Sequence, residues 1–480
     1  MYRCPSPEVA VPGRFRPGVP GMRHERSWLR GTAALTSLAA LVATSLVAGP
    51  AVAEPFTGPC ALERTTAHHS EGLDTWNGAY PRPVRALDAV MVFLAFPDAR
   101  PLTTPGELAA DYFPATDRFY ERASYGRFAL RPHPRDDWIR MPKPSTAYAI
   151  ERDWDAEHRS AYLRDAVAAA DPRVDFADFD VVYFVADPDA PGVDSDATKV
   201  VNFERPVEAD GVAIRRIVTV FERHPPDRNV LAHETGHVFD LPDLYHRPAD
   251  GKGDWDTHVG DWDVMGSQFG LAPDFFGWHK WKLGWLDPGQ VVCVQGRGGT
   301  RLTLETLSAA RGRDTAAGDG PRVPGGPRPG ASTVAEARDA AKESARAMAG
   351  AVAQLIGPFR PARQSGADGG TKLAVVRTGR TTAVAIEARG AVGNDTSTCT
   401  EGVLVYRVRS EAASGAGPVE VVDAHPATDA CGDRSVYPPL ADAPVLPGET
   451  FTVPGERLKV HITVEPRTPA GTWPLTISTS

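Results

Sequence analysis

The five residues HETGH, from His233 to His237, constrain this chain more than any other part of its sequence. Residues four apart on a helix share one face, so both histidines can direct an imidazole at the same ion. Glu234 follows the first histidine and faces the side where a metal-bound water would lie. Asp243 can return a carboxylate to the same ion, because Pro242 ends the helix before it. Two nitrogens and one oxygen leave the fourth position of a zinc ion open, which is typical of catalytic rather than structural zinc sites.

The third ligand of this predicted zinc site has several candidates. Asp243 is favoured, and the alternatives are Asp240, His246 and His258. Asp240 falls one turn beyond His237 and would need the helix to continue through the proline. We expect Asp240 instead to adopt a left-handed backbone conformation, which aspartate tolerates better than most residues. On that basis alone, Asp240→Gly is predicted to be neutral or mildly stabilising.

A second motif, GDWDVMGS from Gly260 to Ser267, places Met265 in a glycine-flanked turn. A lone methionine near a glycine is most often ordinary core, but after HExxH it predicts an apolar floor beneath a zinc site. Candidates for stabilising an oxyanion are Tyr245, His258 and His279, and an ordinary core or surface role is an equally good interpretation of each. The acidic, glycine-rich loop 250–256 leaves Ca²⁺ binding open, but it lacks the EF-hand pattern and a solvated loop is favoured.

Hydrophobic periodicity predicts an α/β domain over residues 86–308, in which a mixed twisted sheet packs on the HExxH helix. The expected strands are 87–94, 125–130, 180–186 and 216–221, and the expected helices are 104–123, 158–170 and 229–239. Short alternating strands near 373–376, 382–386, 403–408 and 458–464 predict a small all-β, sandwich-like domain over 371–480. Between these regions, 309–370 is a Gly/Pro-rich linker with an Ala-rich helix at 333–356. Residues 54–85 form a short N-terminal segment, with a remnant prosegment as one interpretation.

The first 53 residues resemble a removable secretion signal. A basic region begins at Met22, the expected true start, and an apolar run from Ala33 to Ala48 leads to an Ala-x-Ala cleavage site. The run is short for a bilayer span, so we expect a secreted protein without stable membrane insertion. The segment carries six Arg and two Glu, so its removal changes the net charge from −9 to −13. An acidic chain of this kind disfavours nucleic acid as a partner.

Four cysteines remain after this segment, an even number that favours two disulfides in an oxidising compartment. Three pairings are open. We favour Cys399–Cys431, because both lie in polar loops flanking the same strand, and this leaves Cys60–Cys293.

With these motifs, the chain resembles the immune inhibitor A family of secreted bacterial zinc metallopeptidases, which are metzincin-like. The likeness rests on HExxHxxxLPDLY, the WDVMGS turn and the segment FGWHKWKLGWL from Phe276 to Leu286. It is strong over residues 90–290 and weak over 373–410. The resemblance implies that His233, His237 and Asp243 bind zinc and that Glu234 is the general base. Two features depart from the family: Asp240, where the family usually carries glycine, and the long insertion 309–370.

The sequence thus predicts a secreted zinc endopeptidase acting on protein or peptide substrates through a metal-activated water. Two alternatives remain open. One is a secreted binding module that kept the fold without catalysis, against which the intact Glu234 argues. The other is a zinc amidase acting on cell-wall peptides, which the same residues would serve.

Overall fold

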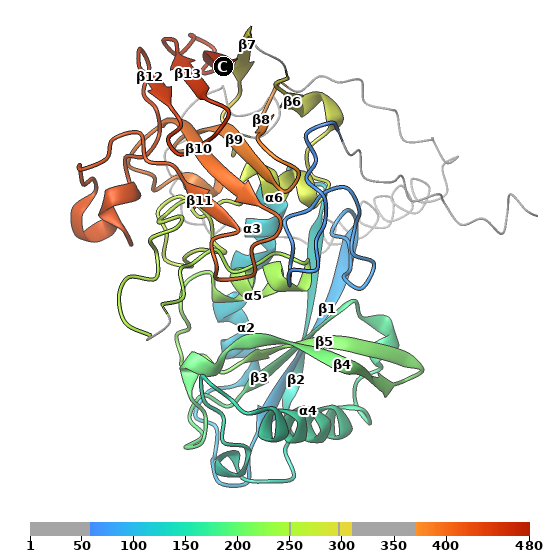
Figure 1. Ribbon diagram of the computed structural model, residues 1–480. Helices are drawn as coiled ribbons and strands as arrows, with labels where there is room; N and C mark the ends of the chain where they lie inside the picture. Colours follow the sequence, from blue (N-terminus) through green and yellow to red (C-terminus); the bar gives the residue numbers. More distant parts are fainter. Residues whose placement is uncertain (1–57, 249–250, 296–297, 310–369) are drawn as a thin grey trace, which may run out of the picture. The chain divides into compact units, whose positions relative to one another are not determined.

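The computed structural model describes residues 58–248, 251–295, 298–309 and 370–480. Within these ranges it is a mixed α/β fold with three β-sheets and few helices (Figure 1). The α-helices are α2 (Pro105–Tyr112), α3 (Ala115–Ala123), α4 (Ala156–Ala170), α5 (Val230–Val238) and α6 (Gly277–Lys282). The strands are β1 (Ala86–Ala95), β2 (Ala129–Arg140), β3 (Val181–Ala186), β4 (Lys199–Ala209), β5 (Val212–Val220), β6 (Val291–Cys293), β7 (Gly298–Leu304), β8 (Leu373–Arg377), β9 (Thr382–Arg389), β10 (Gly402–Arg409), β11 (Val419–Val421), β12 (Thr450–Thr452), β13 (Val460–Val464) and β14 (Trp473–Thr479). The expected signal segment and the Ala-rich helix lie outside the described residues.

The first sheet has the strand order β2-β1-β3-β5-β4. Strands β2, β1, β3 and β5 are parallel, and β4 pairs antiparallel with β5 at one edge, so the sheet is mixed as predicted. All six residues of β3 are buried, which explains its unbroken apolar sequence. The edge position of β4 matters for the site described below.

Alternating residues of the central strands pack into two separate cores. Val90 and Val92 of β1 face a core that includes residues of α4, whereas Met91 and Phe93 face a core that includes residues of α5. Figure 1 shows the two helices on opposite sides of this sheet. The period of two along a strand therefore places the HETGH helix on one face only.

Two boundaries differ from the sequence-based expectation. The helix expected over 104–123 is two helices, α2 and α3, because Pro114 lacks the backbone N–H that a continuous helix needs there. The strand expected at 125–130 begins only at Ala129, since Tyr125 and Gly126 have φ values of 57° and 75° and form a left-handed turn.

The other two sheets have the orders β11-β10-β9-β8-β6 and β12-β13-β14-β7. Strands β6 and β7 precede residue 309, yet β6 pairs with β8 and β7 pairs with β14. One face of the second sheet, including Leu373 and Leu404, shares a core with α5. Its other face, including Val405, packs with Ile462 and Leu475 of the third sheet. The C-terminal strands are therefore continuous with the core that supports the HETGH helix.

Two disulfides join distant parts of the chain, and they are the pairs favoured from the sequence. Cys60 pairs with Cys293 at a Cα–Cα distance of 5.7 Å, and Cys399 pairs with Cys431 at 6.2 Å. In the part of the chain that the structure describes, no helix combines the length and apolar character needed to cross a membrane.

Candidate metal centre

Helix α5 carries the HETGH residues and is fixed by hydrogen bonds from neighbouring elements. The Tyr120 hydroxyl of α3 donates to the Ala232 carbonyl at 2.7 Å. The Tyr183 hydroxyl of β3 lies 2.8 Å from the Thr235 hydroxyl. These buried contacts hold the helix against the sheet, so the direction of its histidines is set before any ligand binds.

The imidazoles of His233 and His237 meet the carboxylate of Asp243. Oδ1 of Asp243 lies 3.3 Å from Nε2 of His233 and 3.0 Å from Nε2 of His237. The Nδ1 of His233 is 2.8 Å from the Val264 carbonyl, and that of His237 is 2.8 Å from the Leu241 carbonyl. A carbonyl can only accept, so each Nδ1 carries a proton, and each Nε2 offers a lone pair when the imidazole is neutral.

These three side chains could hold a metal ion, since their ligand atoms all lie within 4.8 Å of one another. Ligands at about 2.0–2.1 Å in a tetrahedron are separated by roughly 3.3 Å. The two separations from Asp243 are 3.0 and 3.3 Å. Among the described residues, these three form the one group of His, Cys, Asp or Glu whose ligand atoms converge in this way.

The charges of the three groups depend on one another. Burial opposes charge on Asp243, but His237 and His233 hold the pKa of its carboxyl well below the usual range. Burial likewise opposes charge on His237, and the Asp243 carboxylate raises its pKa to about 9. The carboxylate is therefore ionised at neutral pH and is available as an oxygen ligand.

Glu234 is more than nine-tenths buried beside these ligands. Its Oε2 has no hydrogen-bond partner in the described structure. Burial raises the pKa of the Glu234 carboxyl, and the neighbouring imidazoles oppose this rise. A buried carboxylate oxygen without a partner is costly, so its presence here indicates a site shaped for a ligand or a proton transfer.

Asp243 is held in position by a residue that the sequence analysis did not identify. Ser414, in the loop between β10 and β11, donates from its hydroxyl to Oδ2 of Asp243 at 2.9 Å. The same hydroxyl oxygen accepts from the backbone N–H of Asp243 at 2.8 Å. No sequence signal links positions 171 residues apart. The C-terminal strands thus reach the candidate metal ligand directly.

Asp240 has the left-handed backbone predicted for it, with φ of 65°, but its side chain is committed elsewhere. Oδ2 pairs with Arg64 at 2.8 Å, and Oδ1 lies 3.0 Å from Nδ1 of His69. Its carbonyl accepts a hydrogen bond from Lys282 at 2.7 Å. Asp240 therefore lies outside the converging group, and these contacts lead us to expect that glycine would not serve equally well there, contrary to the expectation from the sequence.

The N-terminal segment is part of the site. The ring of His69 stacks on that of His237, with centroids 5.6 Å apart and planes 25° apart. Burial lowers the pKa of His69 to about 4, so it meets Asp240 as a neutral imidazole. The adjacent His68–His69 pair was the available sequence signal, but nothing in it indicated contact with the helix.

The turn containing Met265 lies directly beneath α5. A Cβ added at Gly236 would come within 2.4 Å of the Met265 sulfur, so only glycine leaves room for it. The Met265 backbone N–H donates to Asp263 at 2.8 Å. The other oxygen of Asp263 lies 3.0 Å from Nδ1 of His279, whose Nε2 is 2.8 Å from Glu71. A buried network therefore ties this turn to the N-terminal segment.

Of the remaining candidate residues, one lies at the site and the others lie away from it. Tyr245 lies at the site, with its ring stacked on His233 at a centroid distance of 6.4 Å. His279 is fully buried in the network just described and cannot reach the site. His246 and His258 lie near one another, 5.0 Å between centroids, and outside the converging group. Residues 251–256 of the proposed calcium loop contribute to no such group, and Asp250 lies outside the described residues.

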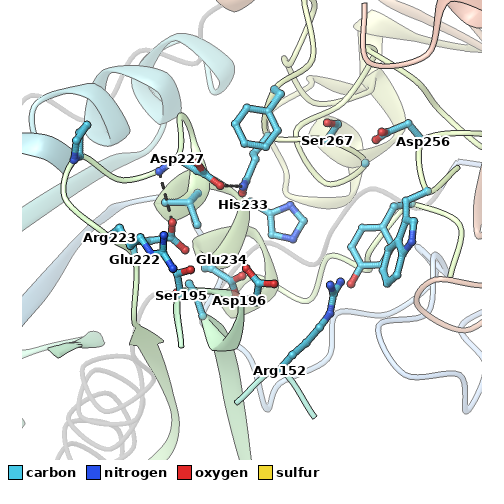
Figure 2. Close-up of a pocket in the computed structure, with 18 residues that line it drawn as sticks. Arg152, Ser195, Asp196, Glu222, Arg223, Asp227, His233, Glu234, Asp256 and Ser267 are labelled. Carbon is cyan, nitrogen blue, oxygen red and sulfur yellow. Dashed lines mark hydrogen bonds between the residues drawn. The ribbon is translucent and has the colours of Figure 1, made fainter. Parts of the chain in front are cut away.

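Two cavities open beside the metal centre, with volumes of about 450 and 420 Å³. They share His233, Glu234 and Tyr245, so they adjoin one another beside the candidate metal site. Figure 2 shows the first cavity, with His233 and Glu234 at its inner wall. An extended molecule can therefore cross the metal centre with one part in each cavity.

A scan against models of protein families gave no match, and a search of curated proteins found none that is significantly similar.

Proposed function

We propose that this chain is a secreted zinc-dependent endopeptidase with a metzincin-like catalytic centre. The observation that carries the proposal is the convergence of His233, His237 and Asp243, with the unpartnered Oε2 of Glu234 beside them. The motif likeness to the immune inhibitor A family and the signal-like N-terminus support it. The glycine-flanked Met265 beneath the helix, which closes the site from below, supports it as well.

A zinc ion held by these ligands would acidify a water molecule and polarise a substrate carbonyl. The protein's own residues then have separate tasks. Glu234, with one free oxygen, accepts the proton of the attacking water and returns it to the departing amine. Tyr245, which lines both cavities, stabilises the oxyanion by a hydrogen bond from its hydroxyl. Ser414 and the two backbone carbonyls orient the ligands.

A peptide is the substrate that the surroundings favour. Strand β4 is the edge of the first sheet and pairs, among the described strands, with β5 alone. Its residues Lys199, Val200 and Asn202 line the second cavity. An exposed strand edge offers backbone donors and acceptors to an extended chain, which is a recurring mode of peptide recognition.

Metal analysis and hydrolysis assays together test the proposal. Purified protein should contain about one zinc per chain, and it should release peptides from casein until a chelator is added. Glu234→Gln should retain zinc but lose most turnover, because it removes the proton acceptor and keeps the ligands. His237→Ala should lose zinc on dialysis. Glu157→Gln, an exposed change on α4, serves as the matched control.

Each contrary result would favour a different alternative to the proposal. Full zinc content in His237→Ala would overturn the ligand assignment. Zinc binding without hydrolysis of casein or cell walls would favour the non-catalytic binding module. Release from cell walls alone would favour the amidase.

A further inference from the structure

The two cavities that meet at the metal centre carry opposite charges. Apart from the shared Arg152 and Asp196 and the metal-site residues, the first cavity presents three carboxylates and one guanidinium. These are Glu222, Asp227, Asp256 and Arg223. On the same basis the second cavity presents two cations, Lys199 and Arg247. We call the first the acidic lobe and the second the basic lobe.

The carboxylates of the acidic lobe lack cationic partners. Glu222 is half-buried and accepts a weak hydrogen bond from the Asp227 backbone at 3.4 Å, and neither it nor Asp256 forms an ion pair within the described structure. Burial raises the pKa of Glu222, and burial followed by the neighbouring acids raises that of Asp256 to about 6. Figure 2 shows Glu222 and Asp256 on opposite sides of the lobe. Arg223 is exposed and pairs with neither.

In the basic lobe, the described side chain without an oppositely charged partner is a cation. The ammonium group of Lys199 is half-buried and donates to the Arg152 carbonyl at 2.6 Å. Among the residues the structure describes, no carboxylate lies within ion-pair distance of it. Burial lowers the pKa of Lys199, as expected for an uncompensated cation. Arg247 contacts Asp153 at 3.4 Å, but both side chains are largely exposed.

Partly buried charges without a partner of opposite charge are unfavourable in the free protein, and a ligand of opposite charge relieves that cost. Glu234 is among the residues that line both lobes, and its buried Oε2 has no hydrogen-bond partner in the described structure. We propose that the cleft selects peptides with a basic side chain on one side of the scissile bond and an acidic side chain on the other. The basic side chain occupies the acidic lobe, and the acidic one contacts Lys199. This inference rests on the proposed peptidase function.

Quenched fluorescent peptides with one fixed scissile pair test the selection. One set carries Lys and Glu on the two sides, a second carries them exchanged, and a third is neutral. At pH 8 and low salt, one of the two charged orders should be cleaved about tenfold more efficiently than the other in kcat/KM, and high salt should reduce the difference. Binding of the same peptides to the Glu234→Gln variant, followed by fluorescence anisotropy, should show the same order.

Variants in each lobe test the two charge preferences separately. Glu222→Gln and Asp256→Asn, tested individually, should reduce the preference for Lys and leave the preference for Glu. Lys199→Gln should do the opposite. Glu157→Gln and Lys459→Gln are matched controls, because both residues are exposed and line neither lobe.

The possible results distinguish this inference from the proposed function. Cleavage of all three sets at equal rates, with the variants unchanged, would overturn the charge selection but keep the peptidase. A preference that the lobe variants do not alter would place its origin elsewhere and also refute the inference. Failure to cleave any of the three sets would instead refute the peptidase.

Discussion

Replacing Asp240 tests whether the N-terminal segment belongs to the folded unit that carries the candidate metal site. The side chain is fully buried, pairs with Arg64 and accepts from His69, while its backbone has φ of 65°. Removing one partner of a buried ion pair costs about 3–5 kcal/mol, and the lower figure applies because Arg64 is partly exposed. Glycine recovers about 1 kcal/mol by relieving the left-handed backbone.

Asp240→Gly should therefore destabilise the protein by about 2 kcal/mol, and Asp240→Ala by about 3 kcal/mol. The free energy of unfolding is measured by urea titration at pH 7, with zinc content determined on the same samples. Zinc should remain at about one per chain in both variants, because Asp240 is not a ligand. Equal stability of Asp240→Gly and the unaltered protein would refute the argument, since only the backbone conformation would then matter. Loss of zinc in Asp240→Ala with retention in Asp243→Ala would reverse the ligand assignment.

Two further predictions concern the supporting residues. Ser414→Ala removes the hydroxyl that orients Asp243, so zinc affinity should fall about 10–100-fold in a competition assay with a chelator, whereas an unchanged affinity would show that the hydroxyl has no orienting role. His279 is buried, but Glu71 and Asp263 raise its pKa to about 9. Because the folded pKa exceeds the unfolded value of about 6.5, the stabilisation is complete below pH 6.5 and is lost as pH rises through 9. Urea unfolding between pH 6 and 10 should show this decline, and His279→Gln should flatten it; an equally steep decline in that variant would exclude His279 as its source.

Local sequence was enough to predict several parts of the fold. Strand β3 followed from an unbroken apolar run, and α4 lies close to its expected range. The prediction of one continuous helix over 104–123 was wrong, because Pro114 separates two helices there. The disulfides were predictable because four cysteines allow few pairings. The pairing of β6 with β8 and of β7 with β14, across residues 310–369, was not predictable, because strand partners depend on contacts between distant residues.

The sequence by itself predicted the candidate group His233, His237 and Asp243, since the four-residue spacing of the histidines on a helix and the proline stop before Asp243 are local properties of the backbone. It also determined that Asp240 would be left-handed. Only the tertiary structure decided what surrounds these residues. Ser414 reaches Asp243 from the C-terminal strands, and His69 reaches His237 from the N-terminal segment. The physical reason is that helix spacing acts over one turn, whereas hydrogen-bond partners and unpaired charges arise wherever folding brings distant segments into contact.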